Sequence, residues 1–465
     1  MADDRLLLKN AVIVNPLQSS VFTGDLRVKG NVIEEVAENI SEKNGDDVFD
    51  LSGKLLMPGL VDTHVHFSSC PDGHFMLAKA GVTSALDMAG NPDEIIGGFM
   101  KRGSGLTLAF LYPLIPGESI SGTSPSEDEL EKAIEYGLKN GALGIKIVGG
   151  HYPLGRDATR NAIRIARKKN CWIAVHAGTL ETPGNIRGME ELVQLAEGNP
   201  LHVAHVNSYC RGTEGRSPLE EAQRAIDALK KAPNCHSESY LALINGTSGR
   251  LDENGIPKSE VTKRSLLHGG YTADAEGIKK AILSGWAKVN YHDQKKHEVV
   301  FPEPAEALDF YMKLNTDVRL SFPVNSPVSA IPIALAKDEK GKFIVDALST
   351  DGGEIPRNIT LKQGLCLVNF GAMTINELAY KASLAPARML GLNDRGYIAE
   401  GGIADLIAVN PLTSQAELSI VEGQIIMRDG NVCGKGGNFL TTHNGKEFFS
   451  SKSIAGRTTE PDWLK

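Results

Sequence analysis

From residue 58 onward, short apolar runs alternate with segments of helical periodicity, and this alternation constrains the fold more than any other feature of the chain. Apolar residues in the intervening segments recur every three to four positions, as at Leu130, Ala133, Ile134 and Leu138, which indicates amphipathic helices. Eight successive strand–helix units predict an α/β fold with a (β/α)8 TIM-like barrel. The eight strand candidates are "GLVDTHVHF", "GVTSALDMA", "LTLAFLYPLI", "GALGIKIVGG", "CWIAVHAG", "PLHVAHVN", "CHSESYLALI" and "FIVDALSTDG".

The two ends of the chain have a different texture. Residues 1–57 alternate short apolar runs with Gly, Asn and Asp turns, and the chain returns to this pattern in "IADLIAVNP" and "VEGQIIMRDGNVC". We expect residues 1–57 and 395–465 to form one small β-sandwich domain, and residues 58–394 to form the barrel. A long connection at about 245–342 is expected to be an insertion over the barrel mouth, in which "KVNYHDQKKH" (288–297) is interpreted as a solvated loop.

Composition excludes several classes of function. The formal net charge is −8 and the pI is about 5.9, without the clustered positive charge that nucleic acids or anionic membranes require. The N-terminus lacks a signal-peptide pattern and no apolar run approaches the length of a membrane span. Six cysteines without a CxxC pair suit a reducing compartment. We therefore expect a cytoplasmic protein without a nucleic-acid or membrane partner, with a homo-oligomer as the base-rate expectation.

Polar residues gather where the predicted strands end. His64 and His66 close the first run and, being two positions apart in a strand, share a face. All such residues should converge on the mouth of a closed barrel, where imidazoles and a carboxylate suit Zn²⁺, Mn²⁺ or Fe²⁺. The candidate metal ligands, in strand order, are His64, His66, Lys146, His176, His205 and Asp351.

Three of these positions have alternative interpretations. Lys146 could extend its ammonium to solvent. However, its apolar flanks should desolvate the ammonium and the expected cations should repel it, and both effects lower its pKa. A neutral buried amine can capture CO2 as a carbamate. His202 and His205 should face opposite sides of their strand, so we expect His205 to be the ligand and His202 to pack outside the barrel. Asp351 could instead cap a following helix.

The motifs "KNAVIVNP", "MPGLVDTHVH", "KAGVTSALDMAG", "HVAHV", "STDGG" and "LAPARMLGL" resemble those of the amidohydrolase superfamily across nearly the whole chain. The resemblance implies two divalent metal ions bridged by hydroxide and by carboxylated Lys146. It places His64, His66 and Asp351 on one ion, and His176 and His205 on the other. Zinc is the favoured metal, with Mn, Fe, Co and Ni as alternatives.

The resemblance also implies a mechanism in which the bridging hydroxide attacks an amide carbonyl and Asp351 passes a proton to the leaving nitrogen. Tyr152, six residues after Lys146, is the candidate donor to the oxyanion, and His151 is its rival. A non-enzymatic scaffold with a degraded metal site is a further alternative. Its signature would be a missing ligand, and none is missing.

Two substrate classes remain open. The lysine in "GIKIVGG" is typical of hydantoinase and dihydroorotase relatives, which open cyclic amides, imides or ureides, and this is the preferred function. The segments "STDGGEIPR" and "SESYLALINGTSG" resemble D-aminoacylases, which deacylate N-acyl-D-amino acids. In that reading Arg357 is a carboxylate clamp and Arg211 a second anion contact, with a surface salt bridge as the alternative for Arg357. The second strand lacks the bridging cysteine found in many D-aminoacylases.

Overall fold

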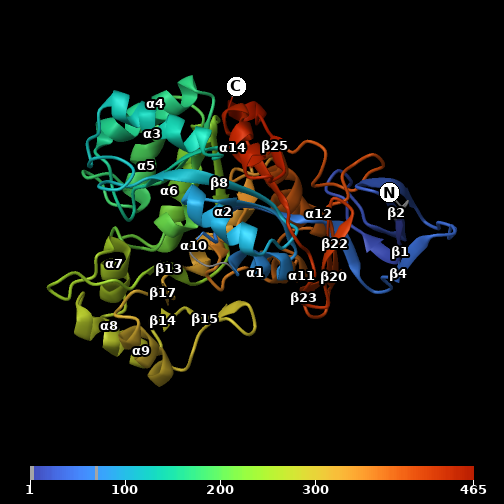
Figure 1. Ribbon diagram of the computed structural model, residues 1–465. Helices are drawn as coiled ribbons and strands as arrows, with labels where there is room; N and C mark the ends of the chain where they lie inside the picture. Colours follow the sequence, from blue (N-terminus) through green and yellow to red (C-terminus); the bar gives the residue numbers. More distant parts are fainter. Residues whose placement is uncertain (1–4, 69–71, 465) are drawn as a thin grey trace.

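The computed structural model describes residues 5–68 and 72–464, and its central element is a parallel sheet that curls into a barrel (Figure 1). β18 (Ala347–Leu348) pairs with the seventh strand, while β19 (Gly352–Gly353) pairs with the first, so the two short strands on either side of Asp351 close the barrel. The predicted barrel and its eight strands are confirmed. The strands are β6 (Leu60–His66), β7 (Val82–Asp87), β8 (Thr107–Leu114), β9 (Gly144–Val148), β10 (Trp172–His176), β11 (Leu201–Val203), β12 (Cys235–Ser239) and β18 (Ala347–Leu348).

Period-two alternation decides which side chains enter the barrel. On β9 and β10, Ile145, Ile147, Ile173 and Val175 pack outward beneath the helices. Trp172 and other inward-facing residues form a separate apolar cluster in the barrel interior. Lys146 lies between two outward isoleucines, so its side chain points inward.

Helices cover the outside of the barrel. In α3, the four apolar positions predicted from the sequence are all buried, and Ser126 caps the helix by accepting a hydrogen bond from the Glu129 backbone N–H. The covering helices are α1 (Gly73–Lys79), α2 (Pro92–Lys101), α3 (Glu127–Lys139), α4 (Arg156–Lys168), α5 (Ile186–Leu195), α6 (Pro218–Lys230), α11 (Thr360–Asn369), α12 (Ile375–Ala379), the π-helical η2 (Tyr380–Leu384) and α13 (Ala385–Met389). No helix among the described residues is both long and apolar enough to cross a membrane.

The long connection between β12 and β18 forms a lobe with its own apolar cluster and a three-stranded sheet in the order β13-β17-β14 (Figure 1). Several of its residues line the cavity at the barrel mouth, as expected for an insertion at this position. Its elements are β13 (Asn245–Ser248), α7 (Glu260–His268), α8 (Ala275–Leu283), β14 (Lys288–Val289), β15 (Tyr291–Asp293), β16 (Glu298–Val300), α9 (Pro304–Lys313), β17 (Arg319–Phe322) and α10 (Pro327–Leu335).

The prediction that residues 288–297 form a solvated loop is wrong for the two histidines. β15 and β16 pair as a hairpin. His292 Nε2 lies 2.5 Å from Asp72 Oδ2, and His297 Nδ1 lies 3.2 Å from Asp72 Oδ1. A carboxylate next to α1 therefore attracts both imidazoles and ties the hairpin to the barrel.

The N-terminal strands pair with strands from residues 406–432 in one sheet, in the order β23-β22-β21-β20-β5-β1-β2-β3, with β4 on β1 (Figure 1). This sheet lies to one side of the barrel and has its own apolar cluster. Its strands are β1 (Arg5–Ile13), β2 (Phe22–Lys29), β3 (Val32–Ala37), β4 (Asp46–Asp50), β5 (Leu55–Pro58), β20 (Leu406–Asn410), β21 (Gln415–Val421), β22 (Gln424–Arg428) and β23 (Asn431–Val432).

The last segment of the chain does not join this sheet, contrary to the expectation for residues 395–465. β24 (Asn438–Thr441) pairs with β8, and β25 (Gly456–Thr458) pairs with β24, with α14 (Lys446–Ser451) between them. The physical reason is that the first half of β8 has a free edge, because β9 pairs with β8 only from Leu111 onward. β24 pairs with this edge at Thr107 and Leu108. This pairing supports a boundary of the small β domain after Val432.

Candidate metal centre

The structure brings all six predicted ligands to the C-terminal end of the barrel. They line one cavity of about 690 Å³ that the insertion also borders. His64 and His66 come from β6, Lys146 from β9 and His176 from the end of β10. His205 follows β11, and Asp351 lies between β18 and β19.

Several side chains of this group lie close enough to share a cation. One donor atom each of His64, His205 and Asp351 lies within 4.8 Å of the other two. The Asp351 Oδ1 atom is 3.4 Å from His64 Nε2 and 3.1 Å from His66 Nε2. The ring of His176 packs against that of His205 with their centroids 4.4 Å apart. The imidazoles and the carboxylate thus form one compact cluster.

The prediction that His202 packs outside the barrel is wrong. Its side chain is fully buried, with Nε2 3.6 Å from Glu238 Oε1 and its ring 5.5 Å from that of Trp172 in the barrel interior. β11 ends at Val203, and His205 adopts a left-handed conformation with φ +37°. This turn breaks strand alternation, so both histidines face inward.

Lys146 is 2% exposed, and within residues 5–68 and 72–464 its amine has only the Met88 sulfur, 3.6 Å away, as a hydrogen-bond partner. No carboxylate among the described residues lies within ion-pair distance of it. Burial lowers the pKa of Lys146 to about 8, although Glu238 and Asp351 oppose this shift. The sequence prediction of a lowered pKa agrees with this environment.

The protonation states favour cation binding. Burial lowers the pKa of His64 to about 4 and those of His176 and His205 well below their usual value. Burial acts to raise the pKa of Asp351, but the Arg357 guanidinium and neighbouring imidazoles outweigh it and hold that pKa well below its ordinary range. Neutral imidazoles beside an ionised carboxylate, with a buried amine that has no carboxylate partner among the described residues, fit a divalent metal centre.

Glu238 is a buried member of this centre that the sequence analysis missed. Its carboxylate accepts hydrogen bonds from His64 Nδ1 at 2.6 Å, from the His205 backbone N–H at 2.7 Å and from the Ser349 hydroxyl at 2.6 Å. Burial acts to raise the pKa of Glu238, but His64 and His202 more than offset it, and the pKa lies well below its usual value. The available signal was an acidic residue within the predicted seventh strand, "CHSESYLALI".

The other predicted site residues occupy different places. Arg357 is buried on the cavity wall, where Nη2 lies 2.7 Å from Asp351 Oδ2 and Nη1 donates to the Ile244 carbonyl at 3.1 Å. Arg211 donates from Nε to Asn325 Oδ1 at 3.1 Å and is not among the residues that line this cavity. The guanidinium of Arg357 is thus already paired with Asp351, and Arg211 lies outside this cavity.

His151 and Tyr152 both border the cavity. The ring of His151 lies 5.3 Å from that of His176, and burial lowers its pKa to about 4. Tyr152 is 44% exposed. His151 therefore contacts the imidazole cluster directly, whereas Tyr152 lies on a more open part of the wall.

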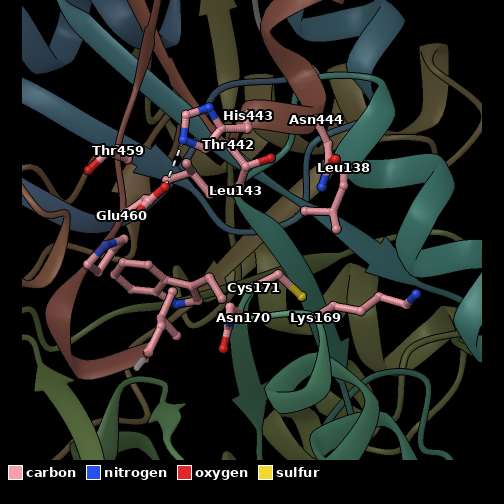
Figure 2. A pocket seen from close by; sticks show the side chains of 13 residues that line it. Leu138, Leu143, Lys169, Asn170, Cys171, Thr442, His443, Asn444, Thr459 and Glu460 are labelled. Atoms are coloured by element: carbon pink, nitrogen blue, oxygen red, sulfur yellow. Dashed lines mark ion pairs between the residues drawn. The ribbon is translucent and has the colours of Figure 1, made fainter.

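A second cavity, of about 200 Å³, lies near the start of β10, away from the end that carries His176 (Figure 2). Its wall combines the start of β10 with the C-terminal segment, including an ion pair of 2.7 Å between His443 and Glu460. Figure 2 shows no predicted ligand among its labelled side chains, which include Leu143, Asn170 and Cys171. The predicted ligands line the cavity at the mouth of the barrel instead.

Comparison with known proteins gives consistent results. The sequence profile of the amidohydrolase family matches residues 55–433. A dihydroorotase from Clostridium botulinum is 24% identical over 436 residues, which cover 87% of this chain and 89% of that protein. A dihydropyrimidinase from Brevibacillus agri superposes with a TM-score of 0.61 at 14% identity, covering 94% and 98% of the two chains. An N-acyl-D-glutamate deacylase from Bordetella bronchiseptica, solved with zinc and a phosphonate inhibitor, gives 0.65 at 14% identity, covering 93% and 98%.

Proposed function

The chain belongs to the amidohydrolase family and is a hydrolase of carbon–nitrogen bonds other than peptide bonds, and from this premise we propose that it opens a cyclic amide, imide or ureide. The observation that carries the proposal is Lys146, a buried amine at the mouth without a carboxylate partner among the described residues. Similarity to dihydroorotases over most of both chains supports the cyclic substrate class.

In this proposal two divalent ions occupy the centre. His64, His66 and Asp351 would hold one ion, His176 and His205 would hold the other, and carboxylated Lys146 would be a ligand to both. Zinc is the favoured metal, because neutral imidazoles and carboxylates suit it. When bound, the ions supply an activated water and polarise the substrate carbonyl.

Asp351 transfers the proton that moves during the reaction. Its carboxylate is kept ionised beside Arg357, so it can accept a proton from the attacking water and return it to the leaving nitrogen. His151 is neutral near pH 7 and lies beside His176, which favours it over the more exposed Tyr152 as donor to the developing oxyanion. The assembled mouth thus offers a proton carrier and an oxyanion donor on the same cavity.

Deacylation of an N-acyl-D-amino acid is the second candidate, because D-aminoacylase shares the fold with a TM-score of 0.62 and Arg357 lies on the cavity wall. The Arg357 Nη2 contact with Asp351 weighs against it, since a carboxylate clamp would have to share that guanidinium. The family match and the complete ligand set give the non-enzymatic scaffold no support. A cytoplasmic location and a homo-oligomer stay part of the proposal.

Metal content and a substrate panel test the function. Protein purified without chelator and with bicarbonate should contain close to two divalent ions per chain and should open dihydropyrimidines, hydantoins or dihydroorotate-like ureides. Lys146→Met should lose most of the metal, whereas Lys381→Met, a matched change at a lysine buried elsewhere, should retain it. Hydrolysis confined to N-acyl-D-amino acids would establish the second candidate instead.

A further inference from the structure

Glu238 connects parts of the barrel that are distant in sequence. It is fully buried on β12, and its three hydrogen-bond donors come from β6, from the turn after β11 and from the residue after β18. The proposed ligand set does not include this carboxylate, and no sequence motif assigned it a role. An ion buried this deeply is retained only when its oxygens are satisfied, and here both oxygens accept hydrogen bonds.

The first consequence concerns the tautomer of His64. The oxygen that His64 Nδ1 contacts, Glu238 Oε1, also accepts the His205 backbone N–H, so it acts as an acceptor and the 2.6 Å contact places the imidazole proton on Nδ1. The lone pair of Nε2 then points to the centre, where Asp351 Oδ1 lies 3.4 Å away. Glu238 thereby fixes both the proton and the ring orientation of His64.

The second consequence concerns His205. Its left-handed backbone, with φ +37°, is an uncommon conformation for a residue with a side chain. The same Glu238 oxygen accepts its backbone N–H at 2.7 Å and so holds the turn that directs the ring inward. The Ser208 hydroxyl donates to the His205 carbonyl and lies 2.6 Å from its Nδ1, which leaves Nε2 free for the centre.

We propose that Glu238 is a positioning residue of the metal centre, which orients His64 through its Nδ1–H and His205 through its backbone N–H. The inference rests on the proposed function, because it presupposes the metal centre. It concerns a carboxylate outside the proposed ligand set, which acts through two of the proposed ligands.

The test compares Glu238→Gln with Asp405→Asn. Glutamine preserves the shape of the side chain but removes the charge that strengthens both hydrogen bonds. Asp405 is a matched control, since it is 2% exposed in the small β domain and accepts hydrogen bonds from Arg395 and the Glu422 backbone. Zn²⁺ affinity is measured by competition with a chelator, and the absorption spectrum of the Co²⁺-substituted protein reports ligand geometry.

Glu238→Gln should bind Zn²⁺ about 10- to 100-fold more weakly than the wild type, with an altered Co²⁺ spectrum. Asp405→Asn should lower thermal stability but leave Zn²⁺ affinity and spectrum unchanged. Wild-type affinity and spectrum in Glu238→Gln would overturn the proposal. If that variant does not fold, the His64 tautomer in the wild-type protein decides by nitrogen NMR: a proton on Nδ1 supports the proposal, and one on Nε2 overturns it.

These readouts separate the inference from the proposed function. Tight Zn²⁺ binding by the wild type without turnover of any substrate in the panel would overturn the proposed reaction and leave the role of Glu238 intact. If the wild type opens a ring substrate but Glu238→Gln binds Zn²⁺ as tightly as the wild type, the proposed reaction stands and the role of Glu238 is overturned.

Discussion

Asp351 contacts both imidazoles and a guanidinium through a single carboxylate. It contacts His64 and His66 through one oxygen and Arg357 through the other, and its backbone adopts a left-handed conformation with φ +49°. The sequence alternative of a helix cap does not hold, because Asp351 precedes β19 and its carboxylate faces the imidazoles. A strand end with this conformation is what allows the carboxylate to reach the centre.

Asp351→Asn should keep the fold and much of the metal while kcat falls by about 10²- to 10⁴-fold, the usual contribution of a positioned proton carrier. The amide retains an oxygen for the metal but cannot accept and return a proton. Steady-state kinetics and metal analysis on the same preparation check this. Full turnover by the variant would remove Asp351 from proton transfer.

At the scale of elements, the C-terminal segment closes the end of the barrel opposite the metal centre. Trp463 packs edge-to-face on Trp172 with ring centroids 4.9 Å apart, and its indole donates to the Met389 carbonyl at 2.9 Å. β24 holds this segment on the free edge of β8. The segment therefore packs on the core of the barrel and contributes no described residue to the cavity at the mouth.

Trp463→Ala should lower the free energy of unfolding by about 3 kcal/mol, because a large ring leaves a cavity against Trp172. Turnover per folded molecule should not change, since the mouth lies at the other end. Denaturant unfolding measures the effect. Leu412→Ala, at a side chain 93% exposed, is the control and should stay within about 0.5 kcal/mol of the wild type; an equal loss in both variants would contradict the prediction.

At the scale of the whole molecule, a second buried lysine makes stability depend on pH. Lys381 is fully buried and donates to the carbonyls of Ala334 and Val345, each at 2.7 Å. Burial lowers its pKa from 10.5 to about 7. Between these two values the unfolded chain binds the proton more readily than the folded protein, so this group makes stability rise with pH from about 7 toward 10.5.

Lys381→Met should remove this dependence. As pH rises from about 7 to about 10, the free energy of unfolding of the wild type should increase relative to that of the variant. Proton linkage predicts an increase of a few kcal/mol. Denaturant unfolding of both proteins at a series of pH values measures it. A difference that stays constant across this range would show that Lys381 keeps the same charge throughout.

Much of the candidate metal centre could be predicted from the sequence, because strand periodicity places His64 with His66 and points Lys146 inward between Ile145 and Ile147. His202 was placed wrongly because alternation holds only while the strand continues, and the turn at His205 is set by tertiary hydrogen bonds. Glu238 was missed for a related reason: its partners come from three other parts of the chain, and only the closed barrel brings them together.

The sequence by itself determined the barrel, the order of its strands and the residue types at its mouth, since these follow from local periodicity and from which side chains end each strand. Only the tertiary structure decided that the C-terminal segment joins β8, that Asp72 holds the insertion hairpin and that Arg357 pairs with Asp351. Each of these depends on a free edge or an unpaired charge that exists only after the barrel has closed. Local sequence pattern cannot predict such partners, because they depend on which backbone hydrogen-bonding groups and charges the rest of the fold leaves without a partner.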